Sequence, residues 1–129
     1  MSPDFLTLEE VLKIHPMQLE RYGGGEGIRD MALLESALAQ PAATFDGQLV
    51  HEDLIAMAAA YLFHIVSNHP FVDGNKRTGL LAALVFLDLN GFVFEHGSQA
   101  LYALTMAIAE GRVDKAYVTT ALRRIAYEF

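Results

Sequence analysis

A chain of 129 residues is long enough for one domain with a buried core, and we expect a single domain over residues 1–129. Sixteen acidic residues against nine basic ones give a net charge of −7, which argues against direct binding of nucleic acid. The absence of cysteine excludes disulfides and thiolate metal sites and fits a cytoplasmic protein. The apolar runs are too short or too interrupted to span a membrane, and the acidic N-terminus lacks a signal-peptide pattern.

The first predicted helix begins directly after Thr7. Thr7 and Glu10 have the spacing of a capping box, in which each side chain bonds the backbone of the other residue. Pro16 is predicted to break or kink this helix near His15, because proline lacks an N–H group and clashes with the preceding turn. The glycines at 23–25 end the helix. They lack the Lys-Ser/Thr of a P-loop, so we interpret them as a flexible connection.

A second helix is predicted over residues 31–40. Asp30 is a good N-cap for it, its leucines and alanines have helical spacing, and Pro41 follows its end. Residues 41–50 then form a loop in which Phe-Asp-Gly at 45–47 is a turn signal.

Two apolar segments, residues 54–66 and 80–89, are rich in alanine and leucine and are predicted to be the central pair of helices. Acidic residues at 52–53 precede the first of them, at its positive end. We interpret His64 as a core residue rather than a ligand. No histidine pair has the i, i+4 spacing of a helical metal site, so no zinc is expected.

Two further helices are predicted in the C-terminal part of the chain. Ser98 is expected to cap the fifth helix, and Asp114 the sixth, over residues 115–127. Arg123 and Arg124 lie at the negative end of the sixth helix, and we interpret them as complements to its dipole. The fold class predicted from these patterns is all-α, a compact bundle of about six helices.

The densest cluster of polar side chains is HPFVDGNKR at residues 69–77, in a turn between the two central helices. Pro70 should end the third helix at about Asn68, because the residue before a proline is pushed out of the α region. Phe71 is expected to anchor the turn to the core. Two buried helices would then hold the turn rigidly, as functional groups require.

The start of the fourth helix, near Asn75 or Lys76, predicts a phosphate site. Its first amides have no partners within the helix and carry partial positive charge, and Lys76 and Arg77 add two full charges. Asp73 would repel a phosphate unless Mg²⁺ lay between them, since Mg²⁺ is typically held by one or two carboxylates and by substrate phosphates. His69 could then take a proton from an attacking hydroxyl.

These residues resemble the signature of the Fic/Doc family, His-Pro-Phe-x-Asp/Glu-Gly-Asn followed by Gly or Lys and then Arg. Most Fic proteins have glycine at the position of Lys76. A lysine there resembles the Doc branch of the family, the death-on-curing toxins. Residues 21–41 and 86–91 also look like Doc segments, so the resemblance covers roughly residues 6–91. One departure is Leu80, where many Fic AMP-transferases carry a second arginine.

The resemblance implies a helical core with residues 41–50 as a flap, a short β-hairpin, over the active site. It also implies a toxin of a toxin–antitoxin pair that moves the γ-phosphate of ATP to a threonine of elongation factor Tu and so stops translation. In that reaction His69 is the base and Asp73 holds Mg²⁺. Four residues bind the phosphates: Gly74, Asn75, Lys76 and Arg77.

Two alternatives remain open. The first is AMP transfer to a protein hydroxyl, with the same residues and the nucleotide reversed; Lys76 and Leu80 favour phosphate transfer over it. The second is a non-catalytic helical module in which the turn is a solvated loop that binds an anion. His69 and Asp73 argue against the second, because a passive anion site needs neither.

Many Fic proteins contain their own inhibitor, a helix with the pattern Ser/Thr-x-x-x-Glu-Gly/Asn. The Glu-Gly pairs of this chain, at 26–27 and 110–111, have Tyr22 and Met106 at the position of the Ser/Thr. The arginine that such a Glu contacts is replaced by Leu80. We therefore expect an external inhibitor, and the resemblance implies a small antitoxin whose disordered tail folds as a helix in an apolar groove.

Overall fold

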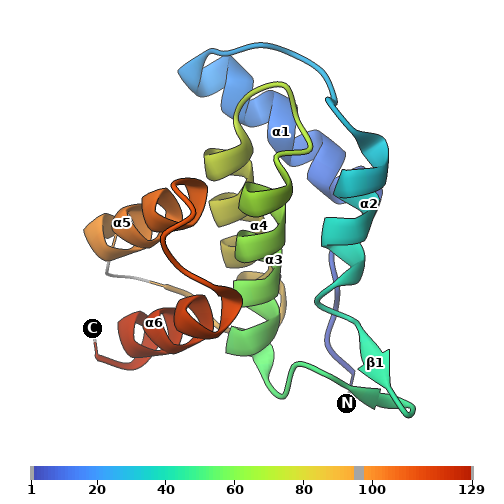
Figure 1. Ribbon diagram of the computed structural model, residues 1–129, viewed down its shortest axis with the longest axis vertical. Helices are drawn as coiled ribbons and strands as arrows, with labels where there is room; N and C mark the ends of the chain where they lie inside the picture. The colour runs from blue at the N-terminus through green and yellow to red at the C-terminus, as the bar shows by residue number, and fades with distance from the viewer. Residues whose placement is uncertain (1, 95–97, 129) are drawn as a thin grey trace.

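The computed structural model describes residues 2–94 and 98–128, and it confirms an all-α fold with one small hairpin (Figure 1). The elements follow one another in the order α1 (Leu8–Tyr22), α2 (Met31–Ala39), β1 (Thr44–Phe45), β2 (Gln48–Leu49), α3 (Leu54–Asn68), α4 (Asn75–Leu89), α5 (Ser98–Ala109) and α6 (Lys115–Glu128). No helix in the described part of the chain is both long and apolar enough to cross a membrane.

The centre of the fold is α3. Ten of its fifteen residues are buried, and it packs against α2, α4, α5 and α6. The α4 helix returns behind it (Figure 1). Gly79 permits a close approach of the two helices, since an added Cβ would lie 2.8 Å from Cγ2 of Val66. The predicted central pair is therefore confirmed, and the turn that joins the pair is held between two buried helices.

Local capping rules set the starts of four helices, α1, α2, α3 and α6. The capping box at Thr7 is present, with Glu10 N–H donating to Thr7 Oγ1 at 3.2 Å and Thr7 N–H donating to Glu10 Oε1 at 2.9 Å. Carboxylates cap α2, α3 and α6 from Asp30, Asp53 and Asp114. The position before α5 lies outside the described residues, and Ser98, the predicted cap, is the first residue of that helix.

Pro16 does not break the first helix. The α1 helix continues through it to Tyr22 and ends at Gly23, which has a φ of 80°. A proline inside a helix removes one backbone hydrogen bond, here the one to the carbonyl four residues earlier. The rest of α1 is kept in place by tertiary contacts of its buried side chains, Val11, Ile14 and His15. Packing thus outweighs the local preference.

The hairpin forms as expected, but it does not cover the turn at residues 69–77. Asp46 and Gly47 both have positive φ, 55° and 77°, as a two-residue hairpin loop of type I′ requires. The hairpin precedes the first residue of α3, whereas the turn follows its last residue. A helix of that length separates them by about 22 Å, and Figure 1 shows them at opposite ends of the bundle. The implied flap position of residues 41–50 is therefore wrong.

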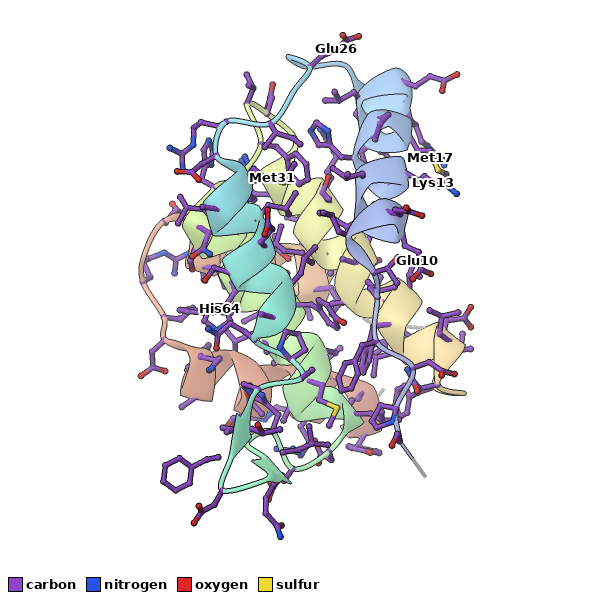
Figure 2. The ribbon with its side chains drawn as sticks, turned by 90° about the vertical axis from the view of Figure 1, so that its right-hand side faces the viewer. Glu10, Lys13, Met17, Glu26, Met31 and His64 are labelled. Carbon is purple, nitrogen blue, oxygen red and sulfur yellow. The ribbon has the colours of Figure 1, made fainter. Side chains whose placement is uncertain are left out.

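Side-chain contacts hold α6 to α3 and to the residues that precede it. The ammonium of Lys115 lies 3.3 Å from Nε2 of His51 and 3.3 Å from Nε2 of His64, which Figure 2 labels. Burial, and then the charge of Lys115, lowers the pKa of His64 to about 4 and lowers that of His51. Arg123 forms an ion pair with Asp53 at 2.7 Å, a role beyond the expected dipole complement.

Candidate active site

The turn begins with a residue in a rare backbone conformation. His69 has φ 51° and ψ 53°, and its N–H bonds the carbonyl of Ile65. The prediction that α3 ends at Asn68 is confirmed, and Pro70 is the cause of the stop. A left-handed conformation costs a non-glycine residue roughly 1–2 kcal/mol, and such strain concentrates at functional sites.

Asn75 ties the two halves of the turn together. Its Oδ1 accepts a hydrogen bond from Phe71 N–H at 2.9 Å, and its Nδ2 donates to the Phe71 carbonyl at 3.0 Å. The same Nδ2 lies 3.1 Å from Nδ1 of His69. The Asn75 side chain is only 4% exposed, so its amide is used within the turn. Its predicted contact with phosphate remains a prediction, and the backbone N–H is the group free to make it.

His15 supports the turn from α1. Its Nε2 lies 2.7 Å from the carbonyl oxygen of Asp73, and its ring stacks on the ring of Phe71. Phe71 is fully buried, as expected of an anchor. Sequence reasoning missed His15, because a single histidine in a helix gives no signal of a contact 58 residues away.

The glycine-rich connection between α1 and α2 lies beside the turn and pairs with it. Val72 N–H donates to the carbonyl of Gly27 at 3.0 Å, and Arg29 N–H donates to the carbonyl of Pro70 at 2.7 Å. The Arg29 guanidinium also donates to the carbonyl of His69 at 2.6 Å. The segment is therefore more than the flexible connection that the sequence predicts, because these bonds fix it against the turn.

Asp73 presents an ionised carboxylate at the surface. Its Oδ1 accepts from the N–H of Gly74 at 2.8 Å, and its Oδ2 lies 3.4 Å from the N of Gly25. These backbone bonds, followed by the nearby charge of Lys76, hold the pKa of Asp73 below its usual range. Gly24 has a φ of 125°, which favours glycine, and a Cβ there would lie 2.8 Å from Asp73 Oδ2.

The donor set at this carboxylate fits Mg²⁺ and no ion that needs several protein ligands. In the described part of the chain, no three histidine or carboxylate side chains gather around one point. Mg²⁺ keeps several waters and is commonly held by one or two carboxylates together with substrate phosphates. Asp73 alone could therefore hold it, with the remaining ligands supplied by nucleotide and water.

The N-terminus of α4 is open for an anion. Gly74 precedes the helix with a φ of 77°, and no side chain caps the first turn. Lys76 and Arg77 are both exposed there. The Arg77 guanidinium lies 4.2 Å above the ring of Tyr22, the last residue of α1, in a cation–π contact. Tyr22 is a second residue that the sequence did not point to.

A cavity of about 250 Å³ borders this end of α4. The predicted site contributes five of its lining residues: Asp73, Gly74, Asn75, Lys76 and Arg77. The other four come from α4 and α5: Leu80, Tyr102, Thr105 and Met106. The structure therefore brings the predicted metal and phosphate residues to one cavity. His69 is not among the lining residues, and the amide of Asn75 connects it to them.

The fold and the site define a helical protein in which an internal helix starts without a side-chain cap and with two exposed basic residues, next to a histidine and an ionised carboxylate. The chain belongs to the Fic/DOC family, whose model matches residues 5–87. It is 36% identical over 121 residues to the "Protein kinase doc" of Escherichia phage P1, over 93% of this chain and 94% of that protein. It is 41% identical over 88 residues to the "Toxin Doc" of Mycolicibacterium smegmatis, over 68% of this chain and 65% of that protein.

Proposed function

We propose that this chain is a protein-modifying phosphotransferase and toxin that moves the γ-phosphate of ATP to a protein hydroxyl. The observation that carries the proposal is the turn itself. Within nine residues it holds His69, the ionised Asp73 and an uncapped helix N-terminus with Lys76 and Arg77. The name of the phage relative, a protein kinase similar along almost the whole chain, supports the same reaction class.

The residues divide the work as phosphoryl transfer requires. The open amides of α4, with Lys76 and Arg77, would bind the phosphate oxygens and stabilise the charge that spreads over them. Asp73 would hold Mg²⁺, which would supply further neutralisation of the phosphates. His69 would take the proton of the acceptor hydroxyl as that hydroxyl attacks the phosphorus. Most of the catalysis in this scheme is positioning of groups on a rigid turn.

The cavity favours phosphate transfer over AMP transfer. Beyond Arg77 its lining changes to Leu80, Tyr102, Thr105 and Met106, none of them charged. Such a wall suits the base and ribose of a nucleotide, whereas terminal phosphates placed there would lack a cation. A nucleotide with its nucleoside against this wall would direct its phosphate end towards the start of α4. AMP transfer needs the opposite orientation and remains the alternative.

Labelled ATP tests the proposal directly. The purified chain is incubated with a bacterial extract, Mg²⁺ and ATP labelled at either the α- or the γ-phosphate. We expect a protein to acquire the γ-label and not the α-label, and the His69→Ala variant to transfer neither. Transfer of the α-label would establish AMP transfer instead. No transfer of either label, by folded protein in extracts of several bacteria, would favour the non-catalytic module.

The acceptor and the inhibitor form part of the same proposal. We infer that the acceptor is a threonine of elongation factor Tu, as the family resemblance implies, and that the reaction takes place in a bacterial cytoplasm. The name "Toxin Doc" of the second relative supports an antitoxin as partner. Purified elongation factor Tu should gain the mass of one phosphate when incubated with the chain and ATP. If purified elongation factor Tu stays unmodified while another protein in the extract acquires the label, that other protein is the target instead.

A further inference from the structure

The backbone of Phe71 fixes the orientation of the Asn75 side-chain amide. The peptide N–H of Phe71 can only donate and its carbonyl can only accept. The N–H faces one end of the amide at 2.9 Å and the carbonyl faces the other at 3.0 Å. The end near the N–H must therefore be Oδ1 and the end near the carbonyl must be Nδ2. A flipped amide would set donor against donor and acceptor against acceptor at a residue that is 4% exposed.

This orientation decides which nitrogen of His69 carries the proton. Nδ2 of Asn75 is the atom that lies 3.1 Å from Nδ1 of His69. An amide nitrogen donates and does not accept, so Nδ1 must offer its lone pair. A neutral imidazole with a free lone pair on Nδ1 has its hydrogen on Nε2.

We propose that Asn75 is a positioning residue that holds neutral His69 in the Nε2–H tautomer in the free protein. Its buried amide is anchored by two bonds to Phe71 and uses its remaining hydrogen to fix the plane and the proton of the imidazole. Asn75 thus acts through His69, in addition to any phosphate contact that its backbone N–H makes.

The consequence for catalysis rests on the proposed function. A base needs a lone pair, and in this tautomer the lone pair of His69 is on Nδ1, where Asn75 binds it. For Nε2 to accept the hydroxyl proton, it must first lose its own hydrogen to water while Nδ1 gains one. An Nδ1–H group cannot face the Nδ2–H of Asn75, so the two side chains must separate in that step. In the free protein, Nε2 of His69 would therefore not be available as the accepting atom.

The tautomer can be measured in the free full-length protein, with no assumption about its activity. Nitrogen-15 NMR of the imidazoles at about pH 9, above the usual titration range of histidine, distinguishes Nε2–H from Nδ1–H rings. Signals are assigned with the variants His69→Gln and His15→Gln. We expect the Nε2–H form for His69. The Asn75→Asp variant places a carboxylate oxygen opposite Nδ1 of His69. Because that oxygen can only accept a hydrogen bond, we expect the tautomer of His69 to invert to Nδ1–H.

His15 reports whether the turn is intact in each variant. Its Nε2 must donate to the Asp73 carbonyl, so it should show Nε2–H before and after the change at Asn75. If Asn75→Asp alters the His15 signal, the test uses Asn75→Ala instead. In that variant His69 should show a mixture of the two tautomers. A wild-type His69 with Nδ1–H, or a His69 tautomer unchanged in a variant whose His15 signal is intact, would overturn the proposal. Failure to transfer phosphate, with the tautomer as expected, would instead contradict only the proposed function.

Discussion

The imidazole of His15 lies parallel to the ring of Phe71, with centroids 3.9 Å apart and planes 8° apart. Its Nε2 also lies 2.7 Å from the carbonyl oxygen of Asp73. One side chain of α1 therefore touches both the anchor of the turn and the peptide that carries the proposed metal ligand. The contact explains why a helix near the start of the chain bears on a site that lies mostly in residues 69–77.

Replacement of His15 by alanine should destabilise the protein. The change removes a buried ring from its stack and leaves the Asp73 carbonyl without its donor, which together should cost about 2–4 kcal/mol of the free energy of unfolding. Urea denaturation measures the loss. Lys13 on the same helix is exposed and projects away from the core (Figure 2), so Lys13→Ala should change stability by less than about 0.5 kcal/mol. Equal losses in the two variants would contradict the role given to His15.

Replacement of Asp73 by asparagine should raise the Mg²⁺ concentration needed for phosphate transfer. Asparagine keeps an oxygen that can accept from Gly74 N–H, but it removes the negative charge that holds the cation. The half-saturating Mg²⁺ concentration should increase by at least about 10- to 100-fold, because loss of even an outer-shell partner of a metal ligand costs that much affinity. Asp88→Asn, an exposed change near the other end of α4, is the matched control. Superimposable Mg²⁺ titrations of the two variants would remove Asp73 from the metal site.

Stability should fall in weak acid because of the histidines at Lys115. Burial lowers the pKa of His64 from 6.5 to about 4, and that of His51 shifts in the same direction. Between those values the unfolded chain binds more protons than the folded one. The contribution of these neutral histidines to the free energy of unfolding is therefore complete above about pH 6.5 and is lost as the pH falls towards 4. Urea midpoints measured from pH 7 to pH 4.5 should decrease, and His64→Gln should decrease less. Parallel curves for the two proteins would exclude His64 as the cause.

Rules that act over a few residues predicted much of this fold. Thr7, Asp30 and Asp114 cap helices where expected, and Pro70 ends α3 where expected, because capping and proline geometry depend on neighbouring residues. Residues 73–77 could be predicted to lie together, since they follow one another in the chain, and they line one cavity; their binding of phosphate remains a prediction. The contacts of His15 could not be predicted, because they join parts of the chain that only tertiary packing brings together.

The position of the hairpin shows the same limit. Its turn residues, Asp46 and Gly47, could be recognised from their types, but where the hairpin lies depends on the direction of α3. That helix carries it to the far end of the bundle, and the glycine-rich connection after α1 occupies the place beside the turn. The contact of Asn75 with His69 could not be predicted for a different reason. An asparagine at the start of a helix next to two basic residues suggests a phosphate ligand, whereas in the fold its amide already bonds Phe71 and lies against His69.

The last prediction concerns inhibition, and it rests on the proposed toxin activity. Neither glutamate of the two Glu-Gly pairs is placed to block the site. Glu26 projects outward from the top of the molecule (Figure 2), and Glu110 pairs with Arg112 at 2.8 Å. Leu80, which lines the cavity, offers no charge for a glutamate to bind. An active chain without an internal inhibitor should harm its host unless another protein inhibits it.

Expression in bacteria tests this expectation. Induced alone, the chain should arrest growth within a few generations, and co-expression of the small gene next to its own should restore growth. The His69→Ala variant should accumulate without arrest, which separates catalysis from the burden of expression. Translation, followed by incorporation of labelled amino acids, should stop before growth does. Unimpaired growth with abundant folded wild-type protein would argue that the chain is inactive in that host or is inhibited by a contact within its own fold.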